Sequence, residues 1–148
     1  MNLLAEKIRN LRIGWNKRAL TEADFHMLCK KLGVYLVEVD SDDMIWEGFY
    51  TIVLGKPTII VNARLRGLER LWVLFHELGH HLLHSPATCF FSQSTIEKAQ
   101  AEANAFATIA LLPKPLLGKM LTWNLFEEDY FPTKILRARL KIMEQFKL

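Results

Sequence analysis

The residues best suited to chemistry in this chain form the pentapeptide His76-Glu77-Leu78-Gly79-His80. Two histidines four residues apart on a helix lie one turn apart on the same face, so both imidazoles can bind one metal ion. Glu77 lies about 100° round the helix from His76, where its carboxylate can face a metal-bound water without being a ligand. Two ligands and a general base in this pattern are typical of metal-dependent hydrolases.

The apolar context of this HExxH motif adds to its weight. The composition predicts the motif by chance in only about 1% of comparable chains. Residues 65–83 are apolar on nearly every side, so we expect a buried central helix that ends before Pro86. Burying imidazoles and a carboxylate costs about 1–3 kcal/mol for each group without a partner. The alternative is a buried His–Glu hydrogen-bonded pair that holds no metal.

A catalytic zinc takes three protein ligands, so a third must come from elsewhere. His81 points about 100° away from His80. His84 lies one turn beyond His80, and three donors in line along one helix cannot surround one ion. Glu102, in a helix predicted over residues 96–112, shares a face with apolar residues: Ala105, Phe106, Ile109 and Leu112. A carboxylate on an apolar stripe is either a ligand or a sign that the helix phase is misassigned, and the sequence leaves both open.

The elements that must position these residues are strands followed by helices. Three strand-like runs, at residues 34–39, 45–54 and 58–61, are separated by turns and predict an antiparallel meander. Other helices are expected over residues 2–13, from a capping box of Thr21 with Asp24 to about Lys31, and from near Pro132 onward, with a short apolar segment at 116–123. We therefore expect an α+β fold in which a three-stranded, mainly antiparallel sheet packs on the buried HExxH helix.

Composition is that of one globular domain, covering residues 1–148. The chain is 51% hydrophobic and 24% charged, which excludes a disordered chain, and its net charge of +3 is too small to imply nucleic acid or a membrane surface. No apolar run reaches the roughly 18 residues that span a bilayer, and charges at residues 6–12 argue against a signal peptide. Cys29 and Cys89 form no metal-ligand spacing and favour a reducing compartment. We expect a cytoplasmic protein.

The stretch FHELGHHLLH at residues 75–84, followed by AEANAFATIALLP at 101–113, resembles the ImmA/IrrE family of bacterial metallopeptidases. The Thr21 helix with LGVYLVEVD and the late RARLK helix also fit that family's layout. The resemblance implies a small zincin-like fold, zinc binding by His76 and His80, catalysis by Glu77, and Glu102 as third ligand. It also implies a substrate class, namely helix-turn-helix repressors of phages, mobile elements or stress regulons, each inactivated by one cut. The segment WNLFEEDYFP departs from the family pattern.

Several further residues are candidates for the site. The strand of Thr58, Ile59, Ile60 and Val61 precedes the HExxH helix. It is either an edge strand that pairs with an extended substrate or an ordinary strand of the sheet. The stabiliser of a tetrahedral intermediate could be any of Tyr50, Tyr130, His81 and His84. Asn104 either braces the site or lies on the helix surface. Zinc suits two histidines and a glutamate, although manganese or iron would also be accepted.

The expected function is that of a zinc-dependent endopeptidase that makes a site-specific cut in a helix-turn-helix repressor. The alternative is a non-catalytic metal-binding antirepressor or antitoxin-like partner protein. The basic residues of the last helix favour a solvated face over a DNA contact, so we expect no direct nucleic-acid binding; they are Lys134, Arg137, Arg139 and Lys141. The tryptophans are interpreted as core or groove residues: Trp15, Trp46, Trp72 and Trp123. The sequence indicates no oligomeric state.

Overall fold

The computed structural model describes residues 2–40, 42–84, 93–123 and 132–148. Within these residues it has six helices and three strands: α1 (Asn2–Arg9), α2 (Glu22–Leu32), β1 (Tyr35–Val39), β2 (Gly48–Val53), β3 (Lys56–Asn62), α3 (Gly67–Leu83), α4 (Gln93–Leu111), α5 (Lys114–Trp123) and α6 (Thr133–Phe146). The α+β class and the HExxH helix are confirmed. The first helix is shorter than expected, because a turn with Arg12 at φ 52° and Gly14 at φ 79° follows it.

The sheet is mixed, with strand order β1-β3-β2. The β2–β3 pair is antiparallel and joined by the two residues Leu54 and Gly55, whose φ values of 50° and 76° are those of a type I′ hairpin turn. The β1–β3 pair is parallel, so the prediction of an antiparallel meander is wrong. The alternation of apolar residues identified the strands but does not specify partners. Strand β3 takes the centre, where Ile59 and Val61 are fully buried.

The central place of β3 also overturns the prediction of an edge strand at Thr58–Val61. Both backbone edges of β3 are engaged, one by β1 and the other by β2. An extended substrate therefore has no free edge to pair with on this strand, and its residues are ordinary members of the sheet. The edge strand that packs on α3 is β2.

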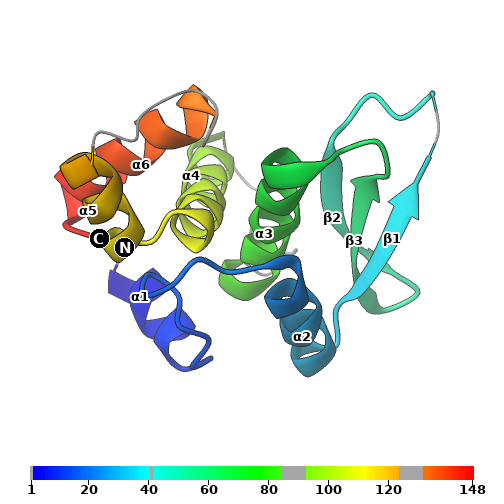
Figure 1. The fold of residues 1–148 in the computed structure, drawn as a ribbon. Coiled ribbons are helices and arrows are strands. Elements are labelled where there is room, and N and C mark those ends of the chain that lie inside the picture. The colour runs from blue at the N-terminus through cyan, green and yellow to red at the C-terminus, as the bar shows by residue number, and fades with distance from the viewer. Residues whose placement is uncertain (1, 41, 85–92, 124–131) are drawn as a thin grey trace.

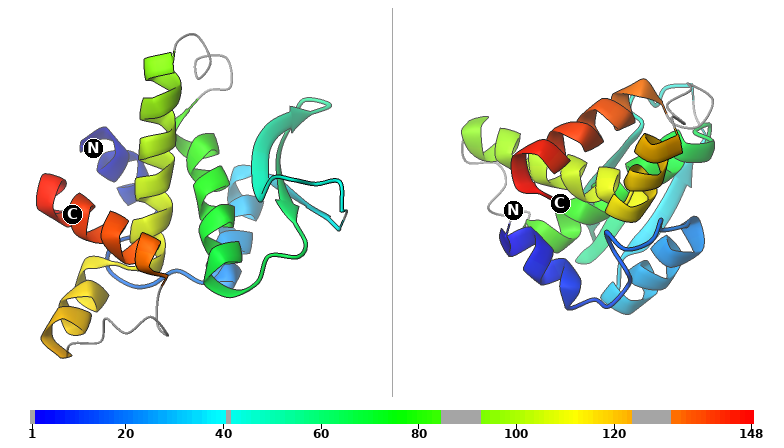
Figure 2. Two further views of the ribbon diagram at one scale, coloured as in Figure 1. Left: turned by 90° about the horizontal axis from the view of Figure 1, so that it is seen from above. Right: turned by 60° about the vertical axis from the view of Figure 1, so that its left-hand side comes forward.

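Helix α3 lies between the sheet and α4 (Figure 1). Seven consecutive residues of α3, from Val73 to Gly79, are buried, as expected for a helix covered on nearly every side. Seen from above, the sheet, α3 and α4 form successive layers, with α6 on the outer side of α4 (Figure 2). Gly79 permits a close approach of α3 to α4, since a Cβ there would lie 3.0 Å from Phe106 Cδ1 and 3.3 Å from Ala103 Cα.

Polar contacts fix the helices around α3. The capping box at the start of α2 is confirmed: Asp24 N donates to Thr21 Oγ1, Thr21 N donates to Asp24 Oδ2, and Gly33 ends the helix with φ 71°. Arg70, near the start of α3, donates from Nε to Glu22 of α2 at 2.7 Å and from Nη2 to Glu38 of β1 at 2.5 Å. These two ion pairs thus hold the beginning of α3 against α2 and β1.

The last helix differs from its predicted solvated face at one position. Arg139 is fully buried, and burial lowers its pKa to about 10, so the guanidinium stays charged near neutrality. It donates to the backbone oxygens of Leu112 and Leu148 at 2.5 and 2.6 Å and to Asn16 Oδ1 at 3.2 Å. The charge pattern placed Arg139 with the exposed basic residues, whereas the helix turns it inward to backbone acceptors.

Within the described ranges, no helix is both long enough and apolar enough to cross a membrane. Cys29 is a buried free thiol whose pKa is raised to about 12 by burial, so it is unreactive. Cys89 lies outside the described residues.

Candidate metal centre

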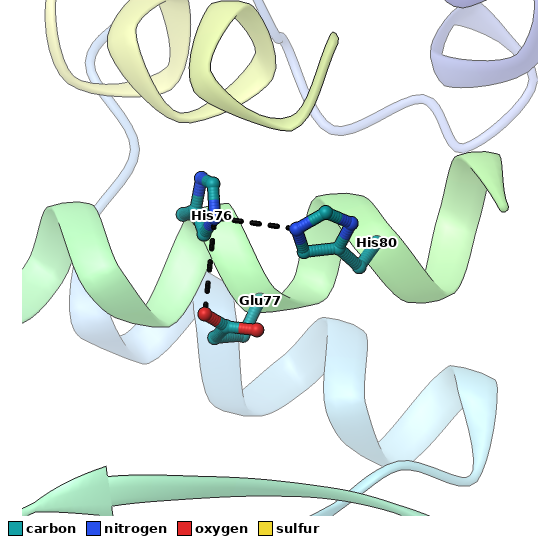
Figure 3. Close-up of side chains that lie close together, drawn as sticks. All are labelled: His76, Glu77 and His80. Carbon is teal, nitrogen blue, oxygen red and sulfur yellow. Dashed lines mark hydrogen bonds and ion pairs between the residues drawn. The ribbon is translucent and has the colours of Figure 1, made fainter. Parts of the chain in front are cut away.

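The HExxH residues converge as helical spacing predicts. His76 and Glu77 are both 8% exposed, and His80 is half-buried one turn further on. The Nε2 atoms of His76 and His80 are 3.2 Å apart, and Glu77 Oε1 is 3.8 Å from His76 Nε2. In Figure 3 the dashed lines join His76 to both His80 and Glu77. Their potential ligand atoms all lie within 4.8 Å of one another.

The imidazole pair fits a metal ion. Two nitrogens bound to one tetrahedral zinc at about 2.0–2.1 Å lie about 3.3 Å apart, close to the separation seen here. Burial, and secondarily the neighbouring His80, lowers the pKa of His76 to about 4, and burial also lowers the pKa of His80. Both rings are therefore neutral near pH 7, the form that offers a nitrogen lone pair to a metal. A neutral, converging pair of this kind, one ring buried and the other half-buried, is suited to hold a divalent ion.

Glu77 has the properties of a general base. Burial raises the pKa of its carboxyl to about 7, and the backbone N–H of Tyr50, which donates to the carboxylate, partly opposes that rise. A group whose pKa lies near the working pH can both accept and return a proton. Because Tyr50 belongs to β2, this contact also links the carboxylate to the edge strand.

Two cavities adjoin the motif. One, of about 540 Å³, lies between β2 and the C-terminal half of α3 and is lined by His80, His84, Ile96 and Ala99. The other, of about 730 Å³, is lined by Trp46, Trp72, His76 and residues of α6. Gly48, Glu77 and Gln100 border both cavities, so the HExxH cluster lies where the two meet. An extended chain lying across both would pass the imidazole pair.

The aromatic support of His76 is a feature that the sequence did not assign. Trp72 stacks on the His76 ring, with centroids 5.0 Å apart and planes at 18°, and its indole N–H donates to Thr108 Oγ1 of α4. The indole thus supports the His76 ring and is itself held by its hydrogen bond to the next helix. The spacing of four residues between Trp72 and His76 was the available indication, since it places both on one helix face.

The structure does not bring Glu102 to the imidazole pair. Its Oε2 lies 3.5 Å from His84 Nε2, an ion-pair distance too long for a good hydrogen bond, and its Oε1 lies 4.0 Å from Lys98 Nζ. Instead, Gln100 Oε1 is 3.3 Å from His80 Nε2, and the Gln100 side chain also hydrogen-bonds His76. Glu102 as third ligand stays a prediction from the sequence. Gln100 is a site residue that the sequence reasoning missed, because only histidines and carboxylates were considered as ligands.

The remaining candidates are partly placed. Tyr50 Oη is 2.8 Å from His81 Nδ1, and Tyr50 and His84 line the smaller cavity. Asn104 lines the larger cavity and hydrogen-bonds His76 although its side chain is exposed, so it combines both interpretations made for it. Tyr130 lies outside the described residues.

Comparison with known proteins agrees with this geometry. Residues 29–146 match the model of Peptidase M78, the IrrE N-terminal-like domain. Over 70 residues the chain is 41% identical to "Uncharacterized immunity region protein 2" of Bacillus phage phi105; the alignment covers 45% of this chain and 44% of that protein. The chain thus matches about half the length of this relative. Because the family match covers most of the chain, including the HExxH helix and α4, the chain belongs to the Peptidase M78 family of IrrE N-terminal-like domains, the group that includes the ImmA/IrrE metallopeptidases.

Proposed function

We propose that this protein is a metal-dependent endopeptidase that makes a site-specific cut in a helix-turn-helix repressor. The observation that carries the proposal is the approach of two neutral imidazole nitrogens, of buried His76 and half-buried His80, to 3.2 Å beside the Glu77 carboxylate. Membership of a peptidase family supports the reaction type. The name of the phage relative, an immunity region protein, supports a role connected with repression.

In this proposal His76 and His80 hold one divalent ion, with zinc the first choice because imidazole nitrogen suits it. The bound ion would supply Lewis acidity, lowering the pKa of a water and polarising the scissile carbonyl. Glu77 accepts the proton of the attacking water and returns it to the leaving amine, which requires a carboxyl pKa near neutrality. Trp72 and Gln100 keep the imidazoles in place.

The free edge of β2 replaces β3 as the proposed substrate-binding strand. Glu47 O accepts from Asn62 N, and antiparallel pairing engages every second residue, so the backbone groups of Gly48, Tyr50 and Ile52 face away from β3. The donation of the Tyr50 N–H to Glu77 is consistent with that direction. Gly48 and Ile52 can therefore pair with an extended peptide lying across the site.

A protein substrate suits the rim of this cleft. Large apolar side chains are exposed along and beside the β2–β3 hairpin: Ile45, Trp46, Phe49, Ile52 and Leu54. Solvent-exposed apolar groups of this number are typical of a surface that binds another protein. Since repressors act on DNA inside the cell, we propose a cytoplasmic site of action.

The test is to incubate the purified protein with any helix-turn-helix repressor that a neighbouring reading frame encodes and to identify fragments by mass spectrometry. We expect one cut in the wild-type reaction. In Glu77→Gln we expect cleavage to fall at least about 10³-fold while zinc binding remains, because only the proton acceptor is lost. Cleavage by Glu77→Gln at the normal rate would refute the assigned base. Repressor release by that variant without any new fragment would favour the non-catalytic antirepressor.

A further inference from the structure

We propose that the amide oxygen of Gln100 is the third protein ligand of the metal held by His76 and His80, in place of a carboxylate. This inference rests on the proposed metal site. Gln100 Oε1 lies 3.3 Å from His80 Nε2, and the same side chain hydrogen-bonds His76. One amide therefore contacts both rings of the HExxH pair from the facing helix α4.

The two separations that His80 Nε2 makes with the other donor atoms are those that one tetrahedral ion requires. Nitrogen and oxygen donors at about 2.0–2.2 Å from a tetrahedral zinc lie about 3.3–3.5 Å apart. The separations here are 3.2 Å between the two Nε2 atoms and 3.3 Å between His80 Nε2 and Gln100 Oε1. Gln100 also borders both cavities together with Glu77, so the fourth position would open on the cleft.

Glu102 is directed elsewhere by the helix that carries it. Both side chains reach histidines of α3 but at different heights, since His84, at the C-cap of α3, lies one turn beyond His80. Gln100 projects toward His80, whereas the Glu102 carboxylate lies beside His84 and Lys98. Among the described residues, Glu77 is the one carboxylate grouped with the imidazole pair.

An amide in this position changes the charge of the site. A carboxylate ligand would neutralise one positive charge of a divalent ion, whereas an amide oxygen contributes only a dipole. The set of two imidazoles and one amide leaves the full charge of the ion on the site. We therefore expect a weaker and more easily reversed metal affinity than a glutamate at residue 100 would give.

The experiment compares zinc affinity in the full chain by competition with a chromophoric chelator, a measurement independent of cleavage. The variants are Gln100→Glu, Gln100→Ala and, as the matched control on the same helix, Glu102→Gln. We expect Gln100→Glu to bind zinc at least about tenfold more tightly and Gln100→Ala about tenfold more weakly. Glu102→Gln should stay within about threefold of wild type. Visible absorption of the cobalt-loaded proteins should shift with Gln100→Glu and not with Glu102→Gln.

The outcomes separate this inference from the proposed function. Loss of zinc binding in Glu102→Gln, with Gln100→Ala unchanged, would overturn the assignment of Gln100. Unchanged affinity in both Gln100 variants would overturn it as well, and thermal unfolding of the metal-free variants shows whether each is folded. A gain of affinity in Gln100→Glu without any cleavage by the wild type would support the ligand assignment while refuting the peptidase. Cleavage by the wild type, together with a third ligand at Glu102, would support the peptidase while refuting the ligand assignment.

Discussion

The close contact of α3 with α4 at Gly79 allows the change in unfolding free energy of Gly79→Ala to be predicted. An alanine Cβ at residue 79 would lie 3.0 Å from Phe106 Cδ1, whereas the optimal separation of two non-bonded carbon atoms is about 3.5–4.0 Å. The neighbours must move by several tenths of an ångström, and overpacking of this kind costs about 1–3 kcal/mol of unfolding free energy. Alanine gains about 1 kcal/mol over glycine from helix propensity. The net expectation for Gly79→Ala is a loss of about 0–2 kcal/mol.

Gly118 in α5 provides the matched control. It is an exposed helical glycine, and a Cβ built there meets no atom within 4 Å. Gly118→Ala should therefore show the propensity gain alone, about 1 kcal/mol. The difference between the two variants, about 1–3 kcal/mol, isolates the steric cost at Gly79. Urea unfolding followed by circular dichroism measures both, provided that the m-values stay equal.

The same substitution should affect the metal centre. Separating α3 from α4 lengthens the 3.3 Å contact between His80 and Gln100, so zinc affinity should fall several-fold in Gly79→Ala and stay unchanged in Gly118→Ala. Equal stabilisation of the two variants would refute the tight helix contact. A destabilised Gly79→Ala with wild-type zinc affinity would refute the link between helix spacing and the site.

Three further predictions concern stability. Arg139→Met should lower the unfolding free energy by about 2–4 kcal/mol in urea melts, because the Leu112 and Leu148 oxygens lose a charged donor; unchanged stability would contradict the buried network. Asp24 has its pKa lowered to about 2, first by its hydrogen bond to Arg18, so its contribution is present above its unfolded pKa near 4 and is lost as pH falls toward 2. Between pH 5 and 2 the unfolding free energy of Asp24→Asn should fall by about 1–2 kcal/mol less than that of the wild type. An equal pH dependence in the two proteins would refute this contribution of Asp24. A chelator should lower the melting temperature of the zinc-loaded protein but not of His76→Ala, and an equal decrease in both would place the metal elsewhere.

Local signals in the sequence determine much of this fold. The capping box at Thr21 and the glycine at residue 33 set the ends of α2 because each satisfies backbone groups within a few residues. Strand pairing was missed because it depends on contacts between distant segments. The run at residues 34–39 carries no information on whether it pairs with its neighbour along the chain or with β3. Arg139 was misplaced for the same reason, since its acceptors belong to residues 16, 112 and 148.

The candidate site shows the same division between local and distant information. His76, Glu77 and His80 share one helix, so the helical repeat alone fixes their relation. The third ligand depends on the rotation and height of α4 against α3, which are set by Gly79, Ala103 and Phe106 at the contact. An apolar stripe indicates which face of a helix enters the core, but a side chain that reaches a cleft lies at the border of that stripe. Glu102 was chosen by the first criterion, whereas Gln100, exposed to the cleft, meets the second.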